Sequence, residues 1–213
     1  MTRKQILMSM VTGFAGLLIT ATANAALVGP YIGGALGWGD IHQTDIYNIK
    51  DNDNFKSKDD GLAGRVFGGI QFHPNVAAEM GYTKFTNATA SSSISDTGFA
   101  ESSDLTIKSY AVDLVAKLTL PLQNNFSLFA KGGAAYLNEQ LTETNTETNL
   151  GVTTATQYNA TDHKVFPTFG LGASYELNKN VTTDISWMHI QKVGDSNLRN
   201  TDFVGLGLTY TIG

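Results

Sequence analysis

The stretch Val204-Gly205-Leu206-Gly207-Leu208-Thr209-Tyr210-Thr211-Ile212 alternates between large apolar side chains and small or polar ones. Because successive side chains of a β-strand point to opposite faces of the sheet, this pattern predicts a strand with one apolar and one polar face. The segments Val76–Phe85, Leu105–Leu120 and Val181–Ile190 repeat the alternation, and their polar faces include charged residues such as Glu79. The chain is therefore predicted to be built from two-faced strands.

Eight strands are predicted from this pattern. They are Tyr31–Asp40, Gly61–Phe72, Val76–Phe85, Leu105–Leu120, Phe126–Leu137, Lys164–Leu177, Val181–Ile190 and Asp202–Ile212. Most are longer than the roughly 5 to 6 residues of an ordinary globular strand. They match the roughly 9 to 11 residues that a tilted strand needs to cross a bilayer.

The predicted connections alternate between long and short. The long ones are Ile41–Asp60, Thr86–Asp104, Asn138–His163 and Gln191–Thr201; the short ones are His73–Asn75, Pro121–Asn125 and Asn178–Asn180. Long extracellular loops opposite short periplasmic turns are the layout of outer-membrane barrels. An even strand number then places both termini in the periplasm. The long connections are rich in Thr, Ser, Asn and Asp, which favours mobile, hydrated loops.

These features predict an all-β fold, an eight-stranded antiparallel up-and-down transmembrane β-barrel. In lipid the sheet must close, because an open edge would leave backbone amides unpaired. The apolar face then meets lipid, whereas a soluble lipocalin-like carrier would need the opposite polarity. Aromatic residues are expected to form two interfacial belts, an outer one of Trp38, Tyr82, Tyr110, Tyr136 and Trp187 and an inner one of Phe72, Phe126, Tyr175 and Tyr210.

Six charged residues are predicted to point into the barrel lumen. They are Arg65, Glu79, Asp113, Lys117, Lys131 and Asp184. Three positive and three negative groups in a narrow lumen favour a balanced ion-pair network, since buried charges must be paired or hydrated. Two interpretations stay open: a plug with no continuous path, or a gate whose pairs exchange partners and admit small ions. Eight strands leave little interior space, which favours the plug.

The first 25 residues have the pattern of a secretory signal peptide. Arg3 and Lys4 precede an apolar segment from Ile6 to Thr20, and Ala23-Asn24-Ala25 fits a cleavage site. The mature chain, residues 26–213, would carry 12 basic and 19 acidic residues, a formal charge of −7. This acidity disfavours nucleic acid as a partner.

No catalytic or metal-binding motif is found. The chain has no cysteine, and its four histidines are scattered without metal-ligand spacing. Asp51-Asn52-Asp53-Asn54 lacks the glycine and final glutamate of a calcium loop. We therefore expect no enzyme, cofactor or metal site. The first three long connections carry formal charges of −2, −3 and −4, so divalent ions bridging them to lipopolysaccharide phosphates are a further hypothesis.

The segment from Phe67 to Tyr82, FGGIQFHPNVAAEMGY, resembles the second and third strands of the outer-membrane protein A family. Leu36-Gly37-Trp38, Lys131-Gly132-Gly133 and the final Tyr210-Thr211-Ile212-Gly213 also resemble strands of that family. The resemblance implies an outer-membrane barrel inserted by the barrel-assembly machinery. It also implies a structural or surface-interaction role, with host-surface or phage proteins as loop partners, or else a weak porin activity.

The sequence departs from the family pattern in three respects, one being that the last strand ends Ile212-Gly213 instead of in an aromatic residue. Better-known members continue into a peptidoglycan-binding domain, whereas this sequence stops at Gly213, so we expect no such domain. The family's proposed lumen gate pairs acidic residues with Arg and Lys, and Glu79 and Lys117 match two of its positions. Other gate positions are Asp184, Ser174 and Ala35 here, so we expect the gate not to be inherited whole.

Overall fold

The structure, a computed structural model, describes residues 28–41, 55–58, 60–96, 99–149, 152–194 and 198–213. The predicted signal peptide, residues 1–25, lies outside the described residues. All regular structure in the described part of the chain is β-strand. None of it forms a helix with the length and apolar character needed to cross a membrane.

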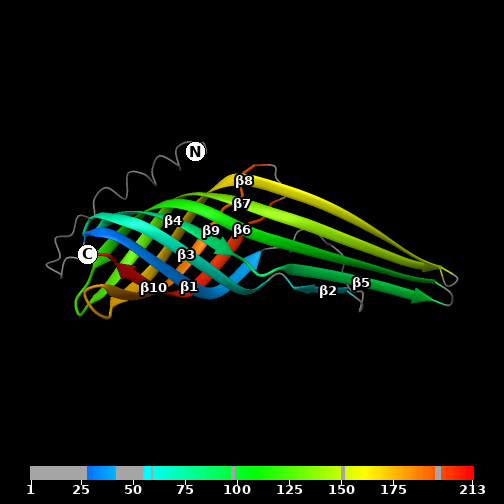
Figure 1. Ribbon diagram of the computed structural model, residues 1–213, viewed down its shortest axis with the longest axis horizontal. Helices are drawn as coiled ribbons and strands as arrows, with labels where there is room; N and C mark the ends of the chain where they lie inside the picture. The colour runs from blue at the N-terminus through cyan, green and yellow to red at the C-terminus, as the bar shows by residue number, and fades with distance from the viewer. Residues whose placement is uncertain (1–27, 42–54, 59, 97–98, 150–151, 195–197) are drawn as a thin grey trace, which may run out of the picture.

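Eight strands form a closed antiparallel ring, which confirms the predicted fold class (Figure 1). They are β1 (Gly29–Ile41), β3 (Asp60–His73), β4 (Val76–Lys84), β6 (Phe99–Pro121), β7 (Phe126–Asn149), β8 (Val152–Glu176), β9 (Val181–Ile190) and β10 (Thr201–Thr211). Pairing of β1 with β10 and of β6 with β7 completes the ring. Within the ring no strand lacks a neighbour on either side, as lipid requires.

Tight turns join the strands at one end of the barrel, which we call the turn end. In the turn between β6 and β7, Asn124 and Asn125 have φ angles of 59° and 65°. Asparagine tolerates this left-handed conformation better than most residues, so it suits a tight hairpin. Between β8 and β9, the Asn178 side chain accepts hydrogen bonds from the backbone N–H groups of Asn180 and Val181, both at 2.9 Å.

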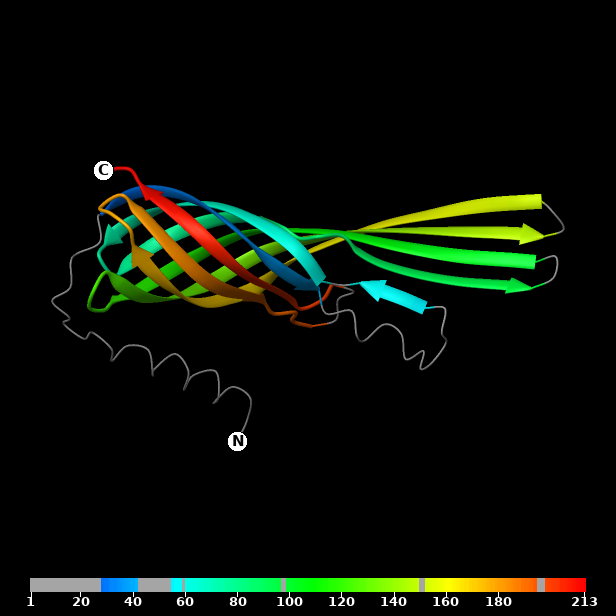
Figure 2. The same cartoon turned by 90° about the horizontal axis from the view of Figure 1, so that it is seen from below.

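At the other end, the strands continue far beyond the ring as a projecting sheet (Figure 2). This sheet comprises β5 (Ala88–Asp96), β2 (Phe55–Lys58) and the extensions of β6, β7 and β8. β6 and β7 pair continuously from Pro121↔Ser127 to Phe99↔Asn149. We call this end the sheet end.

The prediction that Thr86–Asp104 and Asn138–His163 are loops was wrong. Most of these residues belong to β5, β6, β7 and β8. Both faces of these segments are largely polar, so they lack the apolar alternation that marks a strand with one buried face. Threonine nevertheless favours strands, because its branched side chain packs well on a pleated surface. The fourth predicted long connection, Gln191–Thr201, is not wholly hydrated, because its residue Leu198 is fully buried.

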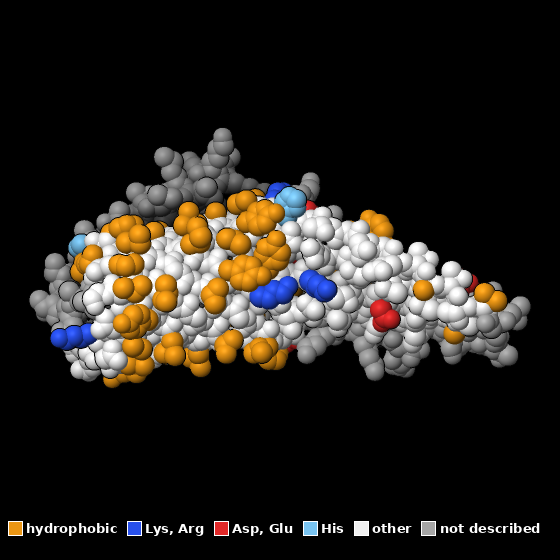
Figure 3. Space-filling view, in the orientation of Figure 1, with side chains coloured by type: hydrophobic (Ala, Val, Ile, Leu, Met, Phe, Trp, Pro, Cys, Tyr) orange, Lys and Arg blue, Asp and Glu red, His pale blue; other side chains and the backbone are white. Residues whose placement is uncertain are grey.

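The ring has the two faces that the alternation predicts. On β10, Val204, Leu206 and Leu208 point outward, with exposed fractions of 46%, 66% and 57%. Phe203, Gly205 and Gly207 face the interior and are buried. Figure 3 shows the outward apolar side chains distributed over the barrel, with the projecting sheet almost free of them.

Candidate functional site

Four of the six predicted lumen charges meet in one cluster, in the half of the lumen near the turn end. Arg65 on β3 lies between Glu79 on β4 and Asp113 on β6. Its Nη2 atom is 3.1 Å from Glu79 Oε1 and 2.9 Å from Asp113 Oδ1. Lys131 on β7 donates to the same Glu79 oxygen at 2.7 Å. All four side chains are buried, so each charge depends on its partners for the stabilisation that water would give.

Polar and aromatic side chains surround this cluster. Tyr31 donates its hydroxyl to Glu79 Oε2 at 3.2 Å, and Arg65 Nη1 lies 3.0 Å from Thr83 Oγ1. Lys131 Nζ lies 5.2 Å from the ring centre of Phe67 and 5.3 Å from that of Phe129. Such rings interact favourably with cations through their electron-rich faces. The inward position of Tyr31, Phe67 and Phe129 was not predicted from the sequence.

The other two predicted lumen charges are placed differently. Lys117 Nζ lies 4.5 Å from the ring centre of Phe129 and 5.8 Å from that of Tyr31. The carboxylate of Asp184 lies against Gly207 on the neighbouring strand, where a Cβ atom would come within 2.7 Å of Oδ2. Among the described residues, neither Lys117 nor Asp184 makes an ion pair within 4.0 Å. The lumen therefore holds a four-membered ion-pair cluster with two separate charges.

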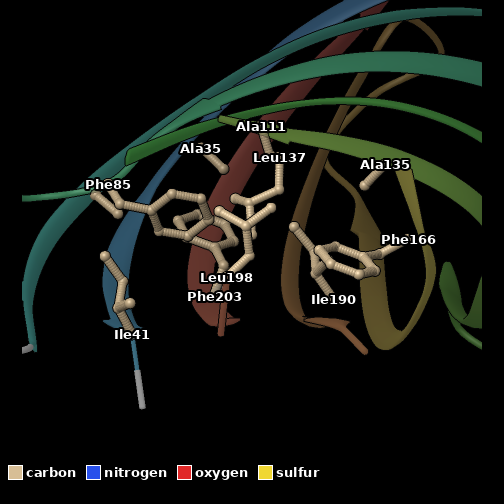
Figure 4. Close-up of a cluster of buried hydrophobic side chains, with 11 residues drawn as sticks. Ala35, Ile41, Phe85, Ala111, Ala135, Leu137, Phe166, Ile190, Leu198 and Phe203 are labelled. Carbon is tan, nitrogen blue, oxygen red and sulfur yellow. The ribbon is translucent and has the colours of Figure 1, made fainter. Parts of the chain in front are cut away.

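The half of the lumen near the sheet end is apolar (Figure 4). Phe85, which directly follows β4, converges there with Leu137, Phe166 and Phe203 of β7, β8 and β10, each with an exposed fraction of at most 4%. Leu198, from the connection between β9 and β10, packs into the same cluster and is fully buried. The prediction of a polar inward face thus holds for one half of the lumen, whereas close-packed hydrocarbon fills the other.

A hydrogen bond links the connection between β9 and β10 to the barrel wall. Arg199, the residue after Leu198, lies 3.4 Å from Glu139 Oε2 on β7. Glu139 lies beyond the predicted outer aromatic belt, on the inward face of β7. Burial raises the pKa of the Glu139 carboxyl to about 7, an effect that the charges of Arg199 and Lys192 oppose and that of Asp162 reinforces. The carboxyl thus titrates close to neutral pH.

All nine predicted belt residues point away from the lumen. The ring centres of Tyr82 and Tyr110 are 5.7 Å apart near the sheet end, and those of Phe126 and Tyr175 are 4.8 Å apart at the turn end. Near the sheet end, Trp187 donates its indole N–H to Asp202 at 2.7 Å. An apolar ring with a polar partner is the arrangement that aromatic residues adopt at a membrane–water interface.

The projecting sheet has two chemically different faces. The face continuous with the lumen, which we call the lumen-side face, carries most of the sheet's acidic residues. Cross-strand register assigns to it Glu101, Glu139, Glu143, Glu147 and Asp162. The opposite face, continuous with the outer surface of the barrel, is the outer face. Its positions on β7 are Thr142, Thr144, Thr146 and Thr148. No group of three or more potential metal ligands occurs among the described residues.

Gly81 offers a test of how far the ion-pair cluster stabilises the barrel. A Cβ atom at Gly81 would lie 2.2 Å from Arg65 Nη2, so Gly81→Ala should displace a guanidinium held by two carboxylates. We expect a loss of about 2 kcal/mol in unfolding free energy, because broken buried pairs leave uncompensated charges. Urea titration of the refolded barrel in detergent measures this loss.

Gly132→Ala is the matched control, because no atom lies within 4 Å of a Cβ atom built there. We expect its unfolding free energy to stay within about 0.5 kcal/mol of the wild type. Equal stability of both variants would show that the cluster adjusts without loss.

The Glu139 carboxyl predicts a pH dependence for the connection between β9 and β10. Its pKa of about 7 exceeds the ordinary glutamate value of 4.5, so the packed state binds a proton more tightly than a solvated state does. Packing of this connection should therefore weaken as pH rises from about 4.5 to about 7. A spin label on Val193→Cys, in a chain without other cysteines, should become more mobile over that range.

Glu139→Gln cannot ionise, so the label should then report a mobility that does not change with pH. A pH response that persists in Glu139→Gln would assign the titration to another group.

Comparison with known proteins identifies the family. Residues 28–213 match the model of the OmpA-like transmembrane domain. Outer membrane protein A of Klebsiella pneumoniae is 26% identical over 191 residues, covering 86% of this chain and 51% of its own length. The chain thus spans about half the length of that relative. An uncharacterized protein of Coxiella burnetii is 27% identical over 215 residues, covering 88% of this chain and 86% of its own length.

Solved structures show the same fold. The N-terminal β-barrel domain of Pseudomonas aeruginosa OprF has a TM-score of 0.51 at 12% identity and covers 87% of this chain and 98% of its own. OprG of the same organism also has a TM-score of 0.51, at 11% identity, and covers 88% of this chain and 99% of its own. With its closed ring of eight strands, the chain belongs to the family of OmpA-like transmembrane domains, the barrels of the bacterial outer membrane.

Proposed function

We propose that this protein is a membrane-anchored platform that displays the projecting sheet on the cell surface. The observation that carries this proposal is the length of β6, β7 and β8, which have 23, 24 and 25 residues. A strand needs only about 9 to 11 residues to cross a bilayer. The additional residues extend outside the membrane, where their paired backbones present a large, ordered surface.

The free edge of β8 supports an interaction role for this sheet. β8 pairs with β9 only from Thr168 to Glu176, whereas its pairing with β7 extends to Val152. The segment from Val152 to Thr161 carries no charged residue and no proline. Charged residues and proline usually protect an exposed edge strand against pairing with another chain, and this segment lacks both. A surface protein with such an edge is suited to contact extended segments of host or phage proteins.

The filled lumen favours this role over that of a porin. A conducting path would have to pass both the Arg65–Glu79–Asp113 cluster and the packed side chains around Phe166 and Leu198. Removing such a close-packed apolar layer requires a rearrangement of the barrel interior, since packed cores contain few voids larger than a water molecule. We therefore assign the barrel an anchoring function.

Shortening the β7–β8 hairpin tests the display function. Thr142 pairs with Asn159, so residues 143–158 can be replaced by an Asn-Gly turn, which suits a two-residue hairpin. We expect unchanged thermal unfolding of the barrel and reduced attachment of producing cells to cultured host cells. If both the wild type and the shortened variant are confirmed on the cell surface, unchanged attachment would refute the proposed role of this hairpin.

A cysteine label establishes which side displays the sheet. Thr154→Cys should react with a membrane-impermeant maleimide on intact cells, whereas Gln123→Cys in the turn-end hairpin should react only after the outer membrane is opened. The reverse pattern would place the projecting sheet in the periplasm.

Planar-bilayer recording distinguishes the anchor from the alternative, a weak porin with a charge-gated lumen. We expect the inserted wild-type protein to give no discrete conductance steps, because the apolar layer offers no hydrated path. The Glu79→Ala variant should also give no discrete conductance steps, because the substitution leaves the apolar layer of the lumen in place. Steps that appear in the wild type and change in Glu79→Ala would establish the porin alternative.

A further inference from the structure

The outer face of β4, β6 and β7 changes its chemistry in three successive layers toward the sheet end. The first is apolar and ends at the paired rings of Tyr82 and Tyr110. The second contains Lys84, which is the next outward residue after Tyr82 on β4. It also contains Lys108, which is the next outward residue after Tyr110 on β6 in the direction of the sheet end. The third is the hydroxyl-rich outer face of the projecting sheet. Figure 3 shows basic side chains immediately beyond the aromatic edge of the apolar surface.

Lys84 and Lys108 are close to one another on the outer face. Lys84 lies directly opposite Tyr110, so Lys108 is its diagonal neighbour on the same face. Diagonal neighbours are about 7 to 8 Å apart, within reach of long side chains. Both are exposed. Within the described residues, neither makes an ion pair or hydrogen bond.

Lys108 is also one of the groups that act on the Lys84 side chain. Partial burial, and next the charge of Lys108, lower the pKa of Lys84. Two ammonium groups that repel one another are stabilised by an anion placed between them. On an otherwise acidic protein with a formal charge of −5, this unpaired basic pair is therefore an anion-binding feature.

The distribution of acidic residues limits where an anion can approach. Glu101, Glu143, Glu147 and Asp162 all lie on the lumen-side face of the projecting sheet. On the outer face of β6 the corresponding acid is Asp104, four residues from Lys108. A polyanion would be repelled by the lumen-side face and attracted to the outer face. The two faces thus differ in charge as well as in their hydroxyl content.

The opposite side of the barrel rim has the reverse charge. Asp40 pairs in register with Asp202 on one side and with Asp60 on the other. Trp38 and Trp187 donate their indole N–H groups to two of these carboxylates, at 2.8 and 2.7 Å. The part of the rim formed by β1, β3 and β10 would therefore repel an anion, in contrast to the side that carries Lys84 and Lys108.

We propose that Lys84 and Lys108 form a binding site for a phosphate group of lipopolysaccharide, with the outer face of the projecting sheet against its saccharide. This inference rests on the proposed display of the sheet at the cell surface. It deepens that proposal by naming the lipid partner and the residues that bind it.

The layered chemistry of the outer face identifies this occupant. Lipopolysaccharide presents acyl chains, then phosphates at the hydrocarbon boundary, then sugars. The outer face of the protein presents matching layers in the same order: the apolar belt, the lysine pair, and the outward threonines of β7 from Thr142 to Thr148. A soluble phosphate would explain the lysine pair alone, and a phospholipid would leave the hydroxyl-rich layer without a partner.

Titration of the refolded protein with lipopolysaccharide tests the site. The wild type should bind phosphorylated lipopolysaccharide about thirtyfold more tightly than the dephosphorylated form, since each lysine near an anionic surface contributes about 1 kcal/mol. In the double variant Lys84→Gln/Lys108→Gln this preference should disappear, with dephosphorylated lipopolysaccharide bound as before. Inorganic phosphate should compete only weakly, because it lacks the acyl and saccharide contacts.

The matched control is Lys164→Gln/Lys179→Gln, which removes two positive charges from the lumen-side face of β8 and from a turn-end hairpin. It should keep the full preference for phosphate. Equal affinity of the wild type for both forms, an undiminished preference in the Lys84/Lys108 variant, or an equal loss in the control would each overturn the site. The maleimide experiment on intact cells is independent of these results, so failure of the phosphate site and failure of surface display are distinguishable.

Discussion

The need to pair every backbone amide in lipid governs the rest of this structure. An unpaired N–H or C=O in hydrocarbon costs several kcal/mol, so a membrane-spanning sheet has to close on itself. Here the register between β1 and β10, from Tyr31↔Thr211 to Ile41↔Thr201, provides that closure. Closure with eight strands leaves an interior only wide enough for side chains. The character of the lumen follows from this geometry.

Charged groups in so narrow a lumen must find partners inside it. Arg65 contacts two carboxylates, and Lys131 shares Glu79 with it. Gly81 provides the space that the guanidinium occupies, which links the cluster to the backbone of β4. Near the sheet end, the lumen is instead filled by aromatic and aliphatic side chains, and Leu198 completes the packing. A lumen with a polar half and an apolar half can thus be rigid without being uniformly charged.

A strand can be predicted from its sequence when its two faces contact different surroundings. For β9 the prediction agrees with the structure to the residue, since one of its faces meets lipid and the other the lumen. Beyond Leu137 the sequence of β7 is largely polar on both faces, so the predicted strand ended at Leu137, whereas β7 continues to Asn149. Inward charges were identifiable from the alternation. Their partners depend on the register between distant strands, which no single segment specifies. The apolar cluster had a weak signal, adjacent apolar residues such as Val165-Phe166 and Phe203-Val204 that interrupt the alternation.

The same strands therefore pass through an apolar, a basic and a hydroxyl-rich layer, and their outward side chains change accordingly. β6 carries Leu114 on its lipid-facing side within the barrel and Lys108 on the same side beyond it. The opposite side of β6 changes from Asp113 in the lumen to Glu101 on the projecting sheet. Most acidic residues of the projecting sheet thus lie on the side away from the membrane, with Asp104 of β6 as an exception, whereas basic and hydroxyl groups predominate on the side that borders lipid. Solubility in water alone would not require such a division, because an exposed sheet can carry acids on either face. A negatively charged membrane surface beside the sheet, as the proposed lipopolysaccharide contact implies, would favour it.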